Sequence, residues 1–283
     1  MKFYIVIPAH NEEDTLGQTL DSLVKQSRLP DKLVVVNDNS TDGTSNIIDS
    51  YSSKYTWIEG LHITSSSEHI PGQKVINAFY EGHEVLDDDY DIICKYDADL
   101  IFPDHYIQKV IEMFSEDAKV GVAGGLPYVK KNGEWKFEAI ASKDHVRGPL
   151  KAYRKECFTE IGGLKRSIGW DSVDVLLAQY HGWKVKTDHS LHVKHLKPTG
   201  AQYNKQSKYL QGEALYKMRF GLLLCTIASL KGAINRGSFS FLLNGIRGFL
   251  KAKKSKKDYL VNEDHGRFIR QLRWRNIRKK LFS

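Results

Sequence analysis

The sequence of 283 residues is poor in cysteine and holds only Cys94, Cys157 and Cys225. The three cysteines are far apart, odd in number and flanked by apolar residues, so they provide neither a disulfide framework nor metal-ligand spacing. A reducing cytoplasm is therefore the compartment that this sequence fits best.

Long apolar runs are also absent. The longest candidates, residues 220–230 and 239–250, are shorter than the ~20 apolar residues that a membrane-spanning helix needs. The apolar segment near the N-terminus is too short for a signal peptide with its cleavage site. We therefore expect a chain that does not cross a membrane.

Acidic residues are scarce in the last part of the chain. Residues 201–283 hold 19 Lys and Arg but 4 Asp and Glu, whereas residues 1–200 hold 23 and 30, so the net charges are about +15 and −7. This asymmetry predicts a globular domain over 1–200 and a basic helical extension over 201–283.

Apolar runs and amphipathic stretches alternate along the first hundred residues. The runs predict strands, and the stretches between them predict helices, the first of them capped by Asn11. Strands that alternate with helices indicate a doubly wound α/β sheet. The predicted strands cover residues 3–7, 32–36, 57–63 and 91–96.

Each of these four predicted strands is followed by a loop rich in polar residues. Ligands of such sheets bind beyond the carboxyl ends of the strands, so the four loops are expected to meet at one site. Further along, 120–125 reads as a strand, Asn132-Gly133 as a tight hairpin turn and 184–197 as strand and loop. Helices are expected at 154–163 and 171–182.

Two aspartates, Asp97 and Asp99, end the buried run 91–96. Residues i and i+2 of an extended chain project to the same side, and two carboxylates placed there repel each other unless a cation lies between them. A hard divalent cation accepts such oxygen ligands. Short acidic triplets also occur at helix starts and turns, but the end of a central strand favours the metal site.

Five motifs occur in a fixed order: FYIVIPAHNEEDTLGQTLDSL, VVVNDNSTDGT, KYDAD, CFTEIGGL and GWDSVDVLLAQYHGWK. In this order they resemble the family 2 glycosyltransferases of the GT-A fold, over roughly residues 3–200. The resemblance implies a Rossmann-like central mixed sheet flanked by helices, with a nucleotide-sugar-binding part over about 1–100 and an acceptor part over about 101–200. It also implies transfer of a sugar from a nucleotide diphosphate donor with inversion at the anomeric carbon.

The resemblance further implies roles for individual residues. Those expected to contact the nucleotide or its diphosphate are Pro8, His10, Glu12, Asp38, Lys74, Asp97 and Ala98. Asp38 could instead cap the helix that follows it or form an Asx turn, and Lys74 could be a solvated charge at a helix start.

The expected metal ligands are Asp99 and His195, with Mn²⁺ or Mg²⁺ as the cofactor. The expected catalytic base is Asp171, with Asp174 as the alternative because the usual Glu-Asp pair reads Trp170-Asp171 here. A metal would stabilise the departing diphosphate, and one carboxylate would deprotonate the acceptor hydroxyl.

The leading hypothesis is an inverting, metal-dependent glycosyltransferase at the cytoplasmic face of the plasma membrane, in the synthesis of a cell-surface polysaccharide or glycolipid. UDP is the favoured donor nucleotide, and the acceptor is a glycan or a lipid-linked molecule. A cationic amphipathic helix near residues 268–281 predicts contact with anionic lipid, although it could also pack on the catalytic domain; nucleic acid is the less favoured partner. The alternatives are a sugar nucleotidyltransferase and a non-enzymatic adaptor that binds membranes or nucleic acid.

Overall fold

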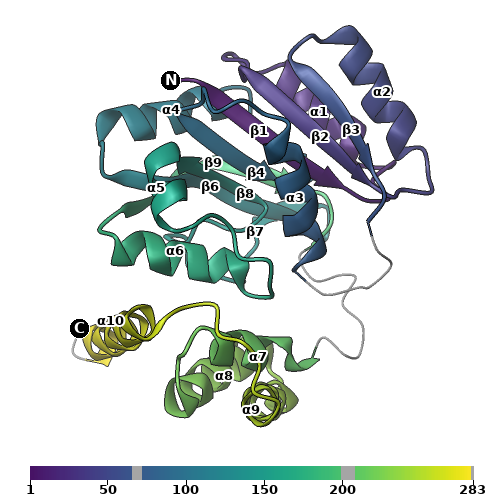
Figure 1. Ribbon diagram of the computed structural model, residues 1–283. Coiled ribbons are helices and arrows are strands. Elements are labelled where there is room, and N and C mark those ends of the chain that lie inside the picture. Colours follow the sequence, from purple (N-terminus) through teal and green to yellow (C-terminus); the bar gives the residue numbers. More distant parts are fainter. Residues whose placement is uncertain (66–71, 199–207, 282–283) are drawn as a thin grey trace. The chain divides into compact units, whose positions relative to one another are not determined.

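The computed structural model describes residues 1–65, 72–198 and 208–281 (Figure 1). Residues 66–71 of the polar loop after the third strand and residues 199–207 at the start of the basic extension lie outside the described residues. The strands, in chain order, are Phe3–Ala9 (β1), Lys32–Asp38 (β2), Ile58–Ile63 (β3), Ile92–Tyr96 (β4), Leu100–Ile101 (β5), Val120–Lys131 (β6), Glu134–Phe137 (β7), Leu150–Arg154 (β8) and Lys184–His195 (β9).

Helices follow or separate these strands. They are Leu16–Val24 (α1), Thr44–Lys54 (α2), Lys74–Glu84 (α3), Tyr106–Glu116 (α4), Lys155–Glu160 (α5), Trp170–Tyr180 (α6), Leu210–Lys217 (α7), Leu222–Arg236 (α8), Phe239–Lys254 (α9) and Glu263–Leu281 (α10). The four strands predicted in the first hundred residues and the helices between them are confirmed, with shifts of a few residues at their ends.

The strands form one mixed sheet in the order β3-β2-β1-β4-β8-β6-β9-β5, with β7 paired to β6. The first four of these are parallel to one another, and β8 then pairs antiparallel with β4 and with β6. Of the four parallel strands, β1, β2 and β4 are buried almost throughout, as expected for strands covered on both faces, whereas only Ile58 of the edge strand β3 is buried. The carboxyl ends of β1, β2 and β4 therefore meet at one edge.

A glycine sets how closely α3 approaches the sheet. A Cβ atom on Gly82 would lie 2.6 Å from a methyl of Val36 and 2.7 Å from a methyl of Val6. These valines belong to β2 and β1, whose backbones are fixed in the sheet and leave no room for a larger residue. Helix α3 thus packs directly on the two strands that lead to the predicted nucleotide loops.

Two local predictions were wrong or incomplete. Asn11 does not cap α1, because the helix begins at Leu16 and Asn11 has a left-handed backbone with φ 54°. Strand β8 was not predicted, because the lysine Lys151 interrupts its apolar pattern, yet the residue is fully buried. The hairpin turn at Asn132-Gly133 is confirmed: both residues have positive φ, as a type I′ turn requires.

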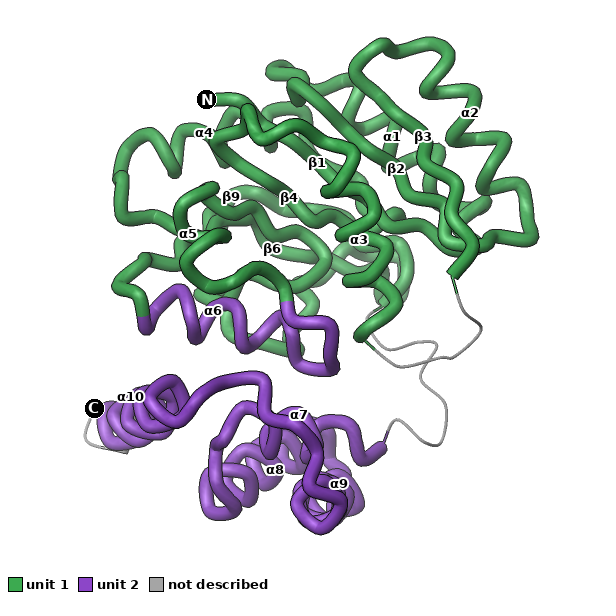
Figure 2. Tube along the Cα trace, viewed as in Figure 1, with its two compact units in different colours: residues 1–164, 181–199 green, residues 165–180, 200–283 purple. Residues whose placement is uncertain are grey.

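The chain divides into two compact units (Figure 2). Unit 1 comprises residues 1–164 and 181–199 and contains the whole sheet; unit 2 comprises residues 165–180 and 200–283 and contains α6 to α10.

Unit 2 is held together by close helix packing. Helices α7 and α9 meet at Gly212, where a Cβ atom would come within 1.9 Å of the Gly245 carbonyl. On α10, Phe268 packs against Tyr180 of α6 with ring centroids 5.4 Å apart, and Ile269 is buried. Among the described residues, no helix combines the length and the apolar character that crossing a bilayer would require.

Candidate active site

The structure brings Asp97, Asp99 and His195 together. One ligand atom from each of the three residues lies within 4.8 Å of the others, which is the spacing of a group that could hold a metal ion. Asp97 and Asp99 follow the end of β4, and His195 ends β9, where its backbone pairs with Leu100 of β5. We call these three residues the metal cluster.

The chemistry of this cluster fits the expected cofactor. Two carboxylates and one imidazole are ligands that Mn²⁺ accepts, and Mg²⁺ favours the carboxylates. Asp99 and His195 are both buried and lie 3.3 Å apart, from Oδ2 to Nε2, whereas the side chain of Asp97 is about a third exposed. The cluster is therefore rigid on its inner side and open at Asp97.

A carboxylate outside the metal cluster, that of Glu138, orients the His195 ring. Its Oε2 atom lies 3.4 Å from His195 Nδ1 and 3.5 Å from Arg147 Nη1, and both Glu138 and Arg147 are buried. Burial alone would lower the pKa of His195, but Asp99 and Glu138 outweigh burial and raise the pKa to about 10. Metal ligands bind without their proton, so occupation of the cluster by a cation would release a proton from this ring.

Helix α1 holds the turn that carries the two aspartates. The buried Thr19 hydroxyl donates to the Ala98 carbonyl at 2.8 Å and accepts from the Leu100 amide at 3.0 Å. Further along the helix, Ser22 accepts from the Phe102 amide, and Gln26, just after the end of the helix, bonds to backbone groups of Pro103 and Ile107. These side chains replace the backbone partners that the turn lacks, so α1 fixes the position of Asp97 and Asp99.

Asp97 also has a neighbour of opposite charge. The ammonium group of Lys95, on β4, is paired with Asp97, although Lys95 itself is buried. Lys95 is in register with the buried Lys151 of β8. Two buried lysines thus lie next to each other beside Asp97, and their positive charge favours anionic groups at this place.

The loops after β1 and β2 are joined by hydrogen bonds. His10 Nδ1 donates to the Asp38 carbonyl at 2.6 Å, and the Asn11 amide group connects the two loops by accepting from the Thr41 N–H at 2.8 Å. The Glu12 N–H donates to Thr44 Oγ1 at 2.8 Å. The predicted nucleotide residues of both loops therefore belong to one rigid rim.

Asp38 carries an unused acceptor in this rim. The side chain is buried, and its Oδ1 atom has no hydrogen-bond partner in the part of the chain that the structure describes. A buried carboxylate oxygen without a donor is costly unless a ligand supplies one. The helix-cap alternative is not seen, because the Gly43 and Thr44 N–H groups at the start of α2 donate to the side chains of Glu13 and Asp42.

The remaining predicted residues are placed as follows. Pro8 is half-buried at the end of β1, and Glu12 Oε2 pairs with Lys197 Nζ at 2.6 Å, so the loop after β9 reaches the same rim. Ala98 is buried between the aspartates, and Lys74 is the half-buried first residue of α3.

The two candidate bases lie in unit 2, on α6. Asp171 is half-buried in the first turn of this helix, and Asp174 is fully buried. A general base must reach its substrate, so the difference in exposure favours Asp171. Its role remains a prediction.

Three residues of the site were not predicted from the sequence: Thr19, Glu138 and Lys197. Thr19 and Ser22 are buried polar residues on the apolar face of α1, and the buried Gln26 follows just after the helix, so this spacing could have indicated a structural role. Glu138 and Lys197 carried no local signal, because only the pairing of distant strands brings them to the site.

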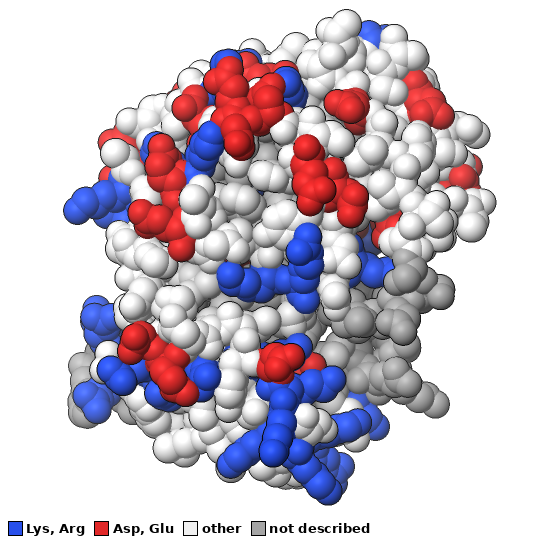
Figure 3. Space-filling view, viewed as in Figure 1, with Lys and Arg blue, Asp and Glu red and all other residues white. Residues whose placement is uncertain are grey.

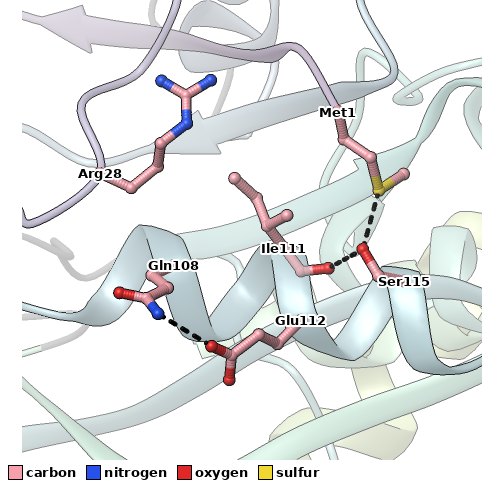
Figure 4. A pocket seen from close by; sticks show the side chains of 6 residues that line it. All are labelled: Met1, Arg28, Gln108, Ile111, Glu112 and Ser115. Atoms are coloured by element: carbon pink, nitrogen blue, oxygen red, sulfur yellow. Dashed lines mark hydrogen bonds between the residues drawn. The ribbon is translucent and has the colours of Figure 1, made fainter.

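A separate hollow lies beside α4 (Figure 4). It offers a single carboxylate and neither His nor Cys, and its polar groups bond to one another, as Gln108 does to Glu112. It therefore has no chemistry comparable with the metal cluster. Its lining residues are Met1, Arg28, Gln108, Ile111, Glu112 and Ser115.

Comparisons with known proteins agree with this geometry. The family model described as glycosyl transferase family 2 matches residues 4–167, which is more than half of the chain. A probable glycosyltransferase of Bacillus subtilis, YdaM, is 28% identical over 186 residues. That match covers 57% of this chain but only 42% of the relative, so the chain spans less than half of that protein's length.

Solved structures show the same fold. S. aureus TarS 1–349 in complex with UDP superimposes with a TM-score of 0.57 at 14% identity, over 90% of this chain and 92% of that chain. A mannosyltransferase of Pyrobaculum calidifontis in complex with GDP-Man and Mn²⁺ gives a TM-score of 0.56 at 13% identity, over 95% and 78%. The predicted GT-A fold, with its mixed sheet, is confirmed by these likenesses.

The ordered motifs, the mixed sheet and the rim that joins two loops to the metal cluster all lead to one assignment. The protein belongs to glycosyl transferase family 2.

Proposed function

We propose that this protein is an inverting, metal-dependent glycosyltransferase that moves a sugar from a nucleotide diphosphate donor to an acceptor hydroxyl. The observation that carries the proposal is the metal cluster at the end of β4, next to the rim formed by the loops after β1 and β2. The family assignment supports an enzyme of this class over a sugar nucleotidyltransferase or a non-enzymatic adaptor.

The rim would bind the nucleotide. The unpartnered Oδ1 of Asp38 would accept a hydrogen bond from the base or the ribose, and His10 would lie beside it. Because His10 Nδ1 donates to a backbone carbonyl, Nε2 is the acceptor of the ring, and it accepts from the Asn11 side-chain amide at 3.5 Å. Lys74 and Pro8 would complete the binding of the donor.

Asp99 and His195 would hold a divalent metal, Mn²⁺ or Mg²⁺, with Asp97 on its open side. When bound, the metal neutralises the negative charge that collects on the diphosphate as its bond to the sugar breaks. Asp171 would accept the proton of the attacking hydroxyl on the opposite face of the sugar. One base without a covalent nucleophile leads to inversion.

We further propose UDP as the donor nucleotide, because solved structures of the same fold bind UDP or UDP-GlcNAc, although a GDP-Man complex is also among them. The acceptor would be a glycan or a lipid-linked molecule. A location at the cytoplasmic face of the plasma membrane, with residues 201–283 against anionic lipid, would bring the enzyme to such an acceptor.

The first test is calorimetric titration of the protein with UDP, GDP, dTDP and CMP, with and without Mn²⁺. Wild type should bind one nucleotide more tightly with the metal, and the Asp99→Asn variant should lose that dependence. Asp104→Asn, an exposed carboxylate in the segment that follows, makes the same change of charge as a control.

Release of the nucleoside diphosphate from UDP-, GDP- and dTDP-sugars then identifies the donor. Absence of binding to every nucleotide, or binding in Asp99→Asn that equals wild type, would overturn the proposal. Release of pyrophosphate from a sugar phosphate and a nucleoside triphosphate would point to the nucleotidyltransferase instead.

A further inference from the structure

Helices α8 and α9 expose large apolar side chains to solvent. The most exposed are Ile234 at 72%, Phe239 at 69% and Leu223 at 63% of their surface. Single exposed apolar residues are ordinary, but two neighbouring helices with several each indicate an interaction surface.

The exposed residues are arranged in two stripes. On α8 the stripe is Leu223, Ile227, Leu230 and Ile234, and on α9 it is Phe239, Leu243, Ile246 and Leu250. Both follow the spacing i, i+4, i+7, i+11, which places four side chains along one face of a helix. Leu230, Leu243 and Leu250 are exposed, and Ile227 and Ile246 are half-buried.

Neither stripe is needed to pack unit 2. Helix α8 packs through Cys225 and Ser229, with the Cys225 sulfur 3.8 Å from the Gly245 carbonyl. Helix α9 packs through Gly245, Gly248 and Phe249. The small and buried residues of both helices thus lie on faces other than the stripes.

The charge around the stripes has one sign. Between Glu213 and Asp258 the sequence holds ten Lys and Arg and no acidic residue. On α9, Arg247, Lys251 and Lys254 are exposed beside the apolar stripe. Figure 3 shows Lys and Arg side chains gathered over the C-terminal helices, with uncharged surface between them.

We propose that the α8 and α9 stripes dock the protein on an anionic lipid bilayer; the inference rests on the membrane location proposed above and names the surface responsible. Apolar side chains enter the boundary between headgroups and acyl chains, and long basic side chains reach anionic headgroups beside them. The apolar stripes thus match the acyl-chain region of the bilayer, and the basic side chains beside them match the anionic headgroups.

Other occupants fit less well. A second copy of this chain would bring an equally basic surface against this one, and like charges repel. Nucleic acid would match the charge but would leave the apolar stripes without a partner. Helix α10, which the sequence favoured for docking, buries Ile269 and packs Phe268 on α6.

The test measures flotation of the full chain with vesicles of phosphatidylcholine, with and without phosphatidylglycerol. One variant changes Leu223, Leu230 and Ile234 to Gln, and another changes Phe239, Leu243 and Leu250 to Gln. The control changes Leu29, Val85 and Ile140 of unit 1 to Gln, which are also exposed apolar residues. Circular dichroism establishes that each variant is folded.

Wild type and the control should bind the anionic vesicles, and each stripe variant should bind at least about tenfold more weakly, since three apolar side chains are lost. Binding by the stripe variants equal to wild type would overturn the assignment of the surface. Docking on lipid would be overturned if the wild type does not bind vesicles. It would also be overturned if the wild type forms oligomers and the stripe variants do not.

Donor hydrolysis without vesicles separates this inference from the proposed function. The stripe variants should hydrolyse the sugar nucleotide as wild type does, because the stripes lie outside the metal cluster and the rim. Vesicle binding by a wild type that neither binds nor hydrolyses any sugar nucleotide would contradict the proposed function and leave the docking surface intact.

Discussion

Unit 1 and unit 2 hold equal numbers of Lys and Arg, 21 each, but unit 1 holds 28 Asp and Glu and unit 2 holds 6. Unit 1 has 183 residues and unit 2 has 100, so the positive charge of unit 2 comes both from a higher density of bases and from the scarcity of acids. In unit 1 the polar groups that matter are buried at strand ends, where they are held by hydrogen bonds. In unit 2 the side chains of the proposed docking surface are exposed. The proposed role of unit 1 thus depends on the exact positions of a few buried polar groups, whereas the proposed role of the docking surface in unit 2 depends on the kinds of side chain that are exposed.

Removal of divalent metal should have the largest effect and should be confined to unit 1. Treatment with EDTA should lower the rate of sugar transfer or donor hydrolysis to less than about a hundredth of the rate of the untreated protein. The reason is that the diphosphate then leaves without stabilisation of its negative charge. Added Mn²⁺ should restore activity, while vesicle binding should not change. Full activity after dialysis against EDTA would show that the metal cluster serves another purpose.

Glu138→Gln should weaken Mn²⁺ binding by about 10- to 100-fold, because the carboxylate that orients His195 is lost. Titration followed by the electron paramagnetic resonance of free Mn²⁺ measures this directly, and high Mn²⁺ should rescue activity. Glu134→Gln, an exposed position of β7, should bind as wild type does. A Glu138→Gln variant with unchanged affinity would leave Glu138 a purely structural residue.

Thr19→Val should destabilise unit 1 by about 1–3 kcal/mol, because the Ala98 carbonyl and the Leu100 N–H lose their partner in a buried turn. Urea unfolding measures the change, and weaker Mn²⁺ binding should accompany it. Thr226→Val in α8 removes a hydroxyl that bonds only within its own helix turn, to Leu222, and should cost less than about 0.5 kcal/mol. Equal effects of the two variants would contradict the role of α1.

Two glycines of unit 1 should respond with opposite signs. Gly82→Ala should cost about 1–3 kcal/mol, because the methyl group would overlap Val36 and Val6. Gly17→Ala in α1 should stabilise by about 0.5–1 kcal/mol, since no atom lies within 4 Å of its new Cβ and the helix gains propensity. The midpoints of urea unfolding test both, and a stabilised Gly82→Ala variant would contradict the close packing of α3.

The sequence was sufficient where the pattern is local. Apolar runs predicted the parallel strands, and the acidic pair after β4 predicted two carboxylates at the end of the strand, while His195 was implied only by the resemblance to the family. The apolar pattern did not predict β8, because this strand contains Lys151, a charged residue that is nevertheless fully buried. It also failed at Glu138 and Thr19, whose partners are distant in the chain. In the C-terminal helices, periodicity indicated an apolar face near 268–281, for which lipid contact or packing was predicted, but it did not indicate the exposed stripes of α8 and α9.

If the protein binds metal and nucleotide as proposed, the hydrogen bonds of Thr19 would couple the two binding events. Helix α1 begins just after the loop that carries His10, and the same helix holds the turn of Asp97 and Asp99. A nucleotide that binds this loop and a metal that binds this turn would both act on α1, so each ligand should change the affinity of the other by the same factor. Titrations of Mn²⁺ with and without UDP, and of UDP with and without Mn²⁺, would measure that factor twice, and Thr19→Val should bring it closer to one.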